Sequence, residues 1–205
     1  SIAGDYTVNY TIAAAVGCDP VSTTASVTIT AAPSASIFYL GSPFCKTLTS
    51  AQPVTRIGTP GGTYTSTPAG LSINASTGAI TPSSSIAGTY TVIYTLANSL
   101  SGCSQYSTPT IVTITAAPSA NIFYLGSPFC QTLGIQSVTQ TGTTGGTYIA
   151  SPAGLLINPS TGEIDPSSST AGTYTVNYTT PAAVGCNQVS TTASVTITTA
   201  PSASI

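Results

Sequence analysis

The sequence predicts an all-β protein, and three observations lead to that prediction. Short runs alternate apolar and hydroxyl side chains: along Gly88–Leu96, tyrosines and aliphatic residues fall on one face and threonines on the other, as in a half-buried strand. Gly, Pro, Asn and Ser separate these runs, as in turns between antiparallel strands. No segment keeps a helical period of about 3.6 residues, so we expect almost no helix.

The chain also contains an internal repeat. The segment Ala32–Cys45, APSASIFYLGSPFC, returns almost unchanged at Ala117–Cys130, and Gly61–Thr95 returns at Gly145–Thr179. The period is about 84 residues, which is typical of tandem arrays. The predicted domains are 1–31, the C-terminal part of a truncated repeat; 32–116 and 117–200, two full repeats; and 201–205, the start of a further repeat.

Each repeat has the pattern of a sandwich. About seven short strands per repeat fit an immunoglobulin-like fold, so we predict tandem immunoglobulin-like β-sandwich repeats of about 84 residues, arranged as beads on a string. Leu71–Asn74 and Ala79–Thr81 are predicted as two short strands, joined by a turn in which Gly78 takes a positive φ. Tyr90 and Tyr174 are predicted tyrosine corners, whose hydroxyls bond back to the backbone.

The charge pattern excludes several classes of function. The 205 residues include two basic side chains, four acidic ones and no histidine, for a net charge of −2. Two cations cannot neutralise a row of phosphates, so nucleic acid is not expected as a partner. No apolar run approaches the roughly 18 residues that membrane insertion needs. Without histidine the chain lacks the commonest general base and metal ligand, so we expect no enzyme, no metal site and no cofactor.

The sequence offers little support for a catalytic site. Glu163 and Asp165 stand two apart on a predicted strand, which is compatible with a glycosidase pair. The other repeat has Ala79 and Thr81 in their places, which favours solvated surface acids. A serine or threonine nucleophile would need a carboxylate or Lys46 as its base, and this lysine is a glutamine in the other repeat.

Two surface features are candidates for binding or modification. The sequence IFYL, at Ile37–Leu40 and Ile122–Leu125, places Phe and Tyr on opposite faces of a strand. We expect core or junction packing there, although an exposed ring could stack on a sugar. Asn9, Asn74 and Asn177 begin N-x-S/T sequons and are candidate glycosylation sites.

The five cysteines follow the repeat. Cys45 and Cys130 both follow GSPF, whereas Cys18, Cys103 and Cys186 follow a glycine at a second shared position. We predict the disulfides Cys45–Cys103 and Cys130–Cys186, one inside each full repeat, and a partner for Cys18 outside the 205 residues. Free thiols or a metal site are the alternatives, and the latter lacks neighbouring Cys or His ligands. Disulfides imply an oxidising, extracytoplasmic compartment.

One motif carries a family resemblance. Both Gly61–Thr95 and Gly145–Thr179 contain PAGLxINxSTGxI followed by AGTYTV. The motif resembles the Ig-like and cadherin-like tandem repeats of bacterial cell-surface proteins. With the GSPFC and GC positions added, it is most similar to repeats of giant secreted proteins of Bacteroidota. That resemblance implies an adhesin or surface fibre, commonly exported by the type IX secretion route.

The sequence departs from cadherin-like modules in its acidic residues. Those modules clamp calcium at domain junctions with clustered carboxylates, whereas none of the four acids recurs in the matching repeat. Junction calcium is therefore not expected. Stiffness would instead come from packing around the proline-containing links at Ala31–Ser36 and Ala116–Asn121.

These features favour a non-catalytic structural segment of a long extracellular bacterial surface filament or adhesin stalk, secreted to the cell surface. The expected partners are neighbouring repeats of the same long chain, with lateral self-association into fibres left open. One alternative is an array of glycan- or surface-binding modules, which predicts an exposed aromatic or polar patch on every repeat. The other is a set of spacer domains of a secreted hydrolase.

Overall fold

The computed structural model describes residues 1–97 and 103–202, and within them it contains strands, two 3₁₀-helices and no α-helix. This confirms the predicted all-β class. The strands are β1 (Gly4–Ile12), β2 (Val21–Ile29), β3 (Ala35–Phe38), β4 (Phe44–Cys45), β5 (Thr55–Gly58), β6 (Thr63–Thr67), β7 (Gly88–Leu96), β8 (Tyr106–Thr115), β9 (Ala120–Phe123), β10 (Phe129–Cys130), β11 (Thr139–Gly142), β12 (Thr147–Ser151), β13 (Gly172–Thr179) and β14 (Ser190–Thr198). The 3₁₀-helices are η1 (Pro82–Ser84) and η2 (Pro166–Ser168).

Internal contacts divide the chain into two compact units. The first unit consists of Ser1–Leu40, Gln52–Ile80 and Tyr90–Val112, and the second of Gly41–Ala51, Thr81–Thr89 and the chain from Thr113 onward. This division runs through residues 32–116. The domain boundaries drawn from the repeat pattern therefore stay a prediction.

The first unit begins with the β1–β2 hairpin. The two strands pair antiparallel from Gly4 opposite Ile29 to Ile12 opposite Val21. The hairpin is a two-stranded sheet whose apolar side chains are exposed, Tyr10 by 65%. The same register recurs in the β13–β14 pair of the second unit, where the equivalent side chains are buried.

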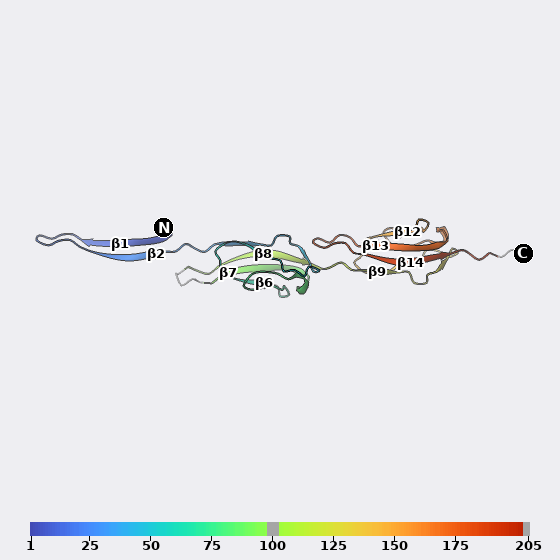
Figure 1. Ribbon diagram of the computed structural model, residues 1–205, viewed down its shortest axis with the longest axis horizontal. Coiled ribbons are helices and arrows are strands. Elements are labelled where there is room, and N and C mark those ends of the chain that lie inside the picture. The colour runs from blue at the N-terminus through green and yellow to red at the C-terminus, as the bar shows by residue number, and fades with distance from the viewer. Residues whose placement is uncertain (98–102, 203–205) are drawn as a thin grey trace. The chain divides into compact units, whose positions relative to one another are not determined.

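The second unit contains a complete sandwich. One sheet has the strand order β10-β14-β13-β12, and a second sheet pairs β11 with β9. Figure 1 labels β12, β13, β14 and β9 of this sandwich. Ile122 of β9 belongs to one buried cluster with Val176 of β13 and Val195 of β14, so side chains of both sheets share the core. Strands β3 to β8 follow the same order, β4-β8-β7-β6 with a separate β3–β5 pair. The tandem immunoglobulin-like sandwich is thus the fold of this chain.

The predicted burial pattern is confirmed along β7. Tyr90, Val92, Tyr94 and Leu96 are all at most 7% exposed, while the threonines between them face the other side. The sequence predicts about seven strands in each repeat, whereas the structure has six, β3 to β8 in one repeat and β9 to β14 in the next.

The strands predicted at 71–74 and 79–81 reduce to a single bridge between Ile73 and Ile80. The backbone amides of this turn bond to a side chain and not to a partner strand, because the side chain of Asn74 accepts from the amides of Ser76 and Thr77. Gly78 has φ 74°, as predicted for that turn.

Tyrosine hydroxyls join distant parts of the backbone. The Tyr174 hydroxyl donates to the carbonyl of Thr170 at 2.7 Å, which confirms the predicted tyrosine corner. Its counterpart Tyr90 is buried to the same degree. In the hairpin, Tyr6 donates in the same way to the Ile2 carbonyl at 2.7 Å. In a chain with so few charged side chains, tyrosine hydroxyls therefore provide hydrogen-bond donors for these backbone carbonyls.

Candidate functional site: the cysteine turns and the strand-end cysteines

The structure contains one disulfide within the described residues, between Cys45 and Cys186, with 4.8 Å between their Cα atoms. Both cysteines lie in the second unit. Cys45 is buried in β4 and pairs with Thr115, the last residue of β8. The Cys186 Sγ lies 3.6 Å from the carbonyl oxygen of Ala116. We call the end of the cysteine-bearing strand, here Phe44–Cys45 with Thr115 and Ala116, the strand-end site.

Cys186 lies in a tight turn that we call the cysteine turn, residues 183–186. Its amide donates to the carbonyl of Ala183 at 2.9 Å, and Gly185 takes φ 82°. A Cβ added to Gly185 would lie only 2.2 Å from the carbonyl oxygen of Pro43. Two features therefore require glycine at position 185: the positive φ and the close approach of the backbone to the strand-end site.

The pairings predicted from the repeat, Cys45–Cys103 and Cys130–Cys186, are corrected by this bond. Cys130 pairs with Thr198 at the end of β14, whereas Cys186 precedes Ser190 at the start of the same strand. A nine-residue strand is about 30 Å long, and disulfide-bonded Cα atoms lie within about 7 Å of each other. Cys130 and Cys186 therefore lie near opposite ends of one strand, too far apart to bond, and Cys186 instead bonds Cys45.

Three cysteines are free: Cys18, which is exposed, and Cys103 and Cys130, which are partly exposed. The Cys103 Sγ lies 3.4 Å from the Thr30 hydroxyl and 3.8 Å from the Ala31 carbonyl. A hydrogen bond from the Thr132 side chain, assisted by its backbone, holds the pKa of Cys130 below its ordinary value. Its thiolate, the reactive form of cysteine, is consequently favoured.

The two candidate carboxylates are engaged by hydroxyl groups of their own loops. Asp165 accepts from the amide and hydroxyl of Ser167 and from the hydroxyl of Ser168. Bonding to these two serine side chains lowers its pKa. Glu163 accepts from the Thr161 hydroxyl at 3.0 Å. Asp165 is the N-cap residue of η2, and Glu163 accepts from a hydroxyl of its own turn.

The IFYL segments place their two aromatic rings on opposite faces, as expected. Tyr39 and Tyr124 are buried, whereas Phe38 and Phe123 are 37% and 43% exposed. Burial raises the pKa of both tyrosines, and a neighbouring tyrosine, Tyr64 or Tyr148, raises it further. An exposed phenylalanine thus recurs at the same position of each full repeat.

The sequon asparagines have different surroundings. Asn9 and Asn74 are exposed and Asn177 is half-buried on β13. The side-chain oxygen Oδ1 of Asn74 already accepts two amides of its turn. Glycosylation at these three positions stays a proposal.

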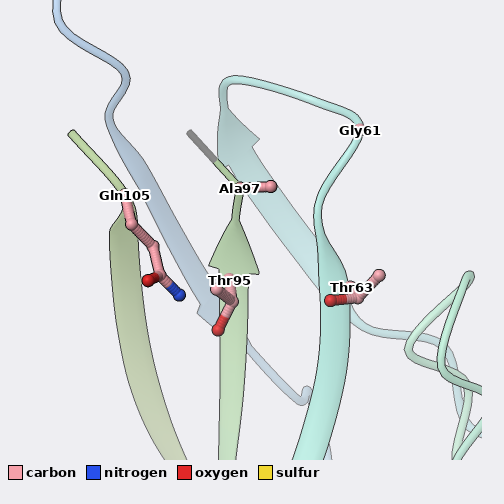
Figure 2. A pocket seen from close by; sticks show the side chains of 5 residues that line it. All are labelled: Gly61, Thr63, Thr95, Ala97 and Gln105. Atoms are coloured by element: carbon pink, nitrogen blue, oxygen red, sulfur yellow. The ribbon is translucent and has the colours of Figure 1, made fainter. Parts of the chain in front are cut away.

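A hollow of about 410 Å³ lies at the end of strands in the first unit (Figure 2). Figure 2 shows the side chains of Thr63, Thr95 and Gln105 at its wall, and Gly61 and Ala97 are the other described residues that line it. None of these five described residues can ionise, and Thr63, Thr95 and Gln105 offer hydrogen-bonding groups.

The described residues hold no cluster of three or more His, Cys, Asp or Glu side chains that could bind a metal ion. Residues 1–97 and 103–202 also include no helix long and apolar enough to cross a membrane.

No protein-family model matches the sequence, and no curated protein matches it. Similar solved structures include the EC22–24 domains of mouse cadherin-23, at 12% identity and a TM-score of 0.42, over 96% of this chain and 74% of that one. A Ca²⁺-stabilised adhesin that helps an Antarctic bacterium bind ice has 19% identity and a TM-score of 0.32, over 97% and 58%. Sidekick-1 immunoglobulin domains 1–5 have 13% identity and a TM-score of 0.32, over 97% and 46%. These likenesses concern the fold alone.

Proposed function

We propose that this chain is a non-catalytic structural segment of a long extracellular bacterial surface filament or adhesin stalk. The observation that carries the proposal is the Cys45–Cys186 disulfide. It joins residue ranges 32–116 and 117–200, which are consecutive copies of one sequence repeat. A covalent bond between consecutive copies is a feature of a chain that must keep its repeats together.

The chemistry of the chain supports an extracellular setting. Disulfides persist in oxidising compartments and are rare in the cytosol. With six charged side chains in 205 residues, the chain depends little on ion pairs, which salt would screen. The proposal keeps an origin in Bacteroidota, which rests on the sequence motif.

Several contacts support a role without catalysis. Glu163 and Asp165 are hydrogen-bonded to hydroxyls of their own loops, and the hollow of Figure 2 has no ionisable lining residue. A general acid–base pair needs two groups poised to exchange protons with a substrate, and these residues have no such arrangement.

Immunogold electron microscopy of native surface material that carries this sequence tests the structural role. An antibody raised against the 205-residue chain should label an uninterrupted fibre at regular intervals. Antibody absorbed beforehand with the same chain is the control, and it should leave the fibre unlabelled. Label confined to a short stalk that ends in a large globule would overturn the proposal and favour a spacer of a secreted hydrolase.

A second candidate, an array of glycan-binding modules, is favoured by the recurring exposure of Phe38 and Phe123. A glycan array probed with the wild-type chain and with the double variant Phe38→Ser/Phe123→Ser tests it. Leu40 and Leu125 are more exposed still, so Leu40→Ser/Leu125→Ser is the matched control. Saturable binding lost only in the phenylalanine variant would support this candidate, and its absence in the wild type would exclude it for the glycans displayed.

A further inference from the structure

The two full repeats, residues 32–116 and 117–200, carry opposite charge. The first contains both basic side chains of the chain and no acidic one, and the second contains two acidic side chains and no basic one. The four residues are Lys46, Arg56, Glu163 and Asp165. Since the rest of each repeat is uncharged, a surface of the first repeat can attract a surface of the second repeat in another copy of the chain.

The acidic side chains of the second repeat line an apolar hollow of about 260 Å³. Ile135 and Leu156 in its wall are 67% and 52% exposed, and Glu163 and Asp165 are half-buried. The other described residues that line it are Ile157, Asn158 and Ile164. We call these seven residues the acidic hollow. Apolar walls with two carboxylates suit an aliphatic stem that ends in a cation, which is the form of a lysine side chain.

The first repeat has a different set of side chains at four of these seven positions. The bridge that joins Gln136 to Ile164 has its counterpart in the bridge that joins Gln52 to Ile80, which aligns the two loops. The four replacements in the first repeat are Ala51 for Ile135, Ser72 for Leu156, Ala79 for Glu163 and Thr81 for Asp165. Each replacement removes apolar surface or a charge. The features that suit a lysine therefore occur together, in the repeat that has no basic residue.

Lys46 lies at a position of the repeat that adjoins the hollow. It is exposed, and its counterpart in the second repeat is Gln131, whose side chain donates to the carbonyl of Ser169 at 2.8 Å. The Ser169 hydroxyl accepts from the amide of Leu156 and donates to the carbonyl of Asp165. Two repeats of opposite charge that meet through this part of the fold therefore bring a lysine to the hollow.

Arg56 is the less suitable cation. Its guanidinium donates to the carbonyl of Gly58 at 2.7 Å and lies 5.9 Å from the centroid of the Tyr94 ring. These contacts hold the arginine against its own repeat, whereas the exposed Lys46 can reach a neighbour.

We propose that the acidic hollow binds the Lys46 side chain of a second copy of this chain, so that copies associate side by side. The apolar walls cover the methylene stem, and the carboxylates pair with the ammonium group. Pairing of two basic or two acidic repeats is disfavoured by repulsion, so the contact selects repeats of opposite charge. One exposed ion pair is weak, but a long chain of such repeats makes the contact many times. This repetition rests on the proposed function, in which the chain is a segment of a longer filament.

Zero-length cross-linking with a carbodiimide tests the contact on the purified 205-residue chain. The reagent joins an amine to a carboxylate that touches it, and Lys46 is the only lysine. Unlabelled and ¹⁵N-labelled chains are mixed in equal amounts at low ionic strength, cross-linked, reduced and digested with chymotrypsin. We expect Lys46 linked to Glu163 or Asp165 in peptides that combine the two isotopes. Their yield should fall about fivefold or more at high ionic strength, because salt screens exposed charges.

The repeats themselves supply the matched variants. Lys46→Gln introduces the residue of the second repeat, and Glu163→Ala/Asp165→Thr introduces those of the first. Each variant alone should lose the link between chains. A mixture of the two variants should regain it, because one supplies the carboxylates and the other the lysine, and regain also shows that both are folded. Arg56→Gln, which introduces the residue found at position 140, is the control and should keep the wild-type yield.

Three results from the wild-type chain would overturn the proposal. They are the absence of any link to Lys46, links from Lys46 mainly to Asp5 or Asp19, and links found only in peptides of a single isotope, which would place both partners in one chain. A labelled native fibre without the Lys46 link would refute this inference and leave the proposed function standing. The link in the purified chain without a native fibre would refute the proposed function alone.

Discussion

The hydroxyl of Tyr124 donates a 2.6 Å hydrogen bond to the backbone carbonyl of Gly162, 38 residues further along the chain. The same bond joins Tyr39 to Gly78 in the preceding repeat, also at 2.6 Å. Each ties the residue that follows β9 or β3 to a tight turn, residues 158–162 or 74–78. Both bonds are buried, so loss of the donor leaves a carbonyl without water to replace it.

Tyr124→Phe should lower the free energy of unfolding by about 1–3 kcal/mol, the cost of an unsatisfied buried polar group. Urea unfolding followed by circular dichroism measures the change. Tyr10→Phe is the control, because Tyr10 is 65% exposed, and its effect should stay within about 0.5 kcal/mol. Equal losses in the two variants would contradict the role of the Gly162 bond.

Alkaline pH should destabilise the chain through Tyr39 and Tyr124. Burial raises the pKa of both hydroxyls in the folded state, above the value of about 10 for an unfolded tyrosine. Their contribution is therefore fully present below pH of about 10 and is lost as pH rises further, because only the unfolded chain then ionises. Urea midpoints measured across this range should fall less steeply for Tyr39→Phe/Tyr124→Phe. An unchanged slope in that variant would contradict the assignment.

Gly185→Ala should prevent closure of the Cys45–Cys186 bond. The added methyl would lie 2.2 Å from the Pro43 carbonyl oxygen, and backbone oxygen cannot move aside cheaply. Gly17→Ala is a matched control, because its φ is nearly the same and its methyl meets nothing within 4 Å.

Thiol titration of the chain unfolded without reductant should detect two more thiols in Gly185→Ala than in Gly17→Ala. The same number of thiols in both variants would show that the turn tolerates a side chain at the contact.

Cys130 should be alkylated at lower pH than it would be without the Thr132 hydroxyl. That hydroxyl is the main cause of its lowered pKa, so Thr132→Val should shift the pH profile of iodoacetamide modification upward. Thr132→Ser keeps a hydroxyl and should preserve the wild-type profile. Mass spectrometry of the Cys130 peptide follows this site alone, and coincident profiles for the valine and serine variants would refute the prediction.

Much of the fold could be predicted because strand patterning is local. The buried face of β7, the Tyr174 corner and the positive φ of Gly78 each follow from a few adjacent residues. The disulfide could not be predicted in the same way. Counting cysteines within one repeat assigns partners by nearness in sequence, whereas pairing depends on which end of a strand each cysteine occupies.

The sequence shows one half of what the correct pairing requires, the position of Cys186 before a predicted strand, but not the other half. Cys186 comes just before the strand Ser190–Thr198, and Cys130 pairs with the last residues of that strand. Knowing that the segment at Cys130 lies parallel to the end of β14 would have separated the two cysteines by a strand length. That parallel pairing is a long-range contact, and no local pattern encodes it.

The disulfide has a mechanical consequence. Cys45 and Cys186 are 141 residues apart in sequence, and fully extended polypeptide spans about 3.5 Å per residue, so the loop holds on the order of 490 Å of contour length. When the chain is pulled from outside the loop, tension passes from one sulfur to the other and the enclosed strands carry no load. Extensibility of this segment is therefore governed by the redox state of its surroundings, because a reductant releases that hidden length and force alone does not.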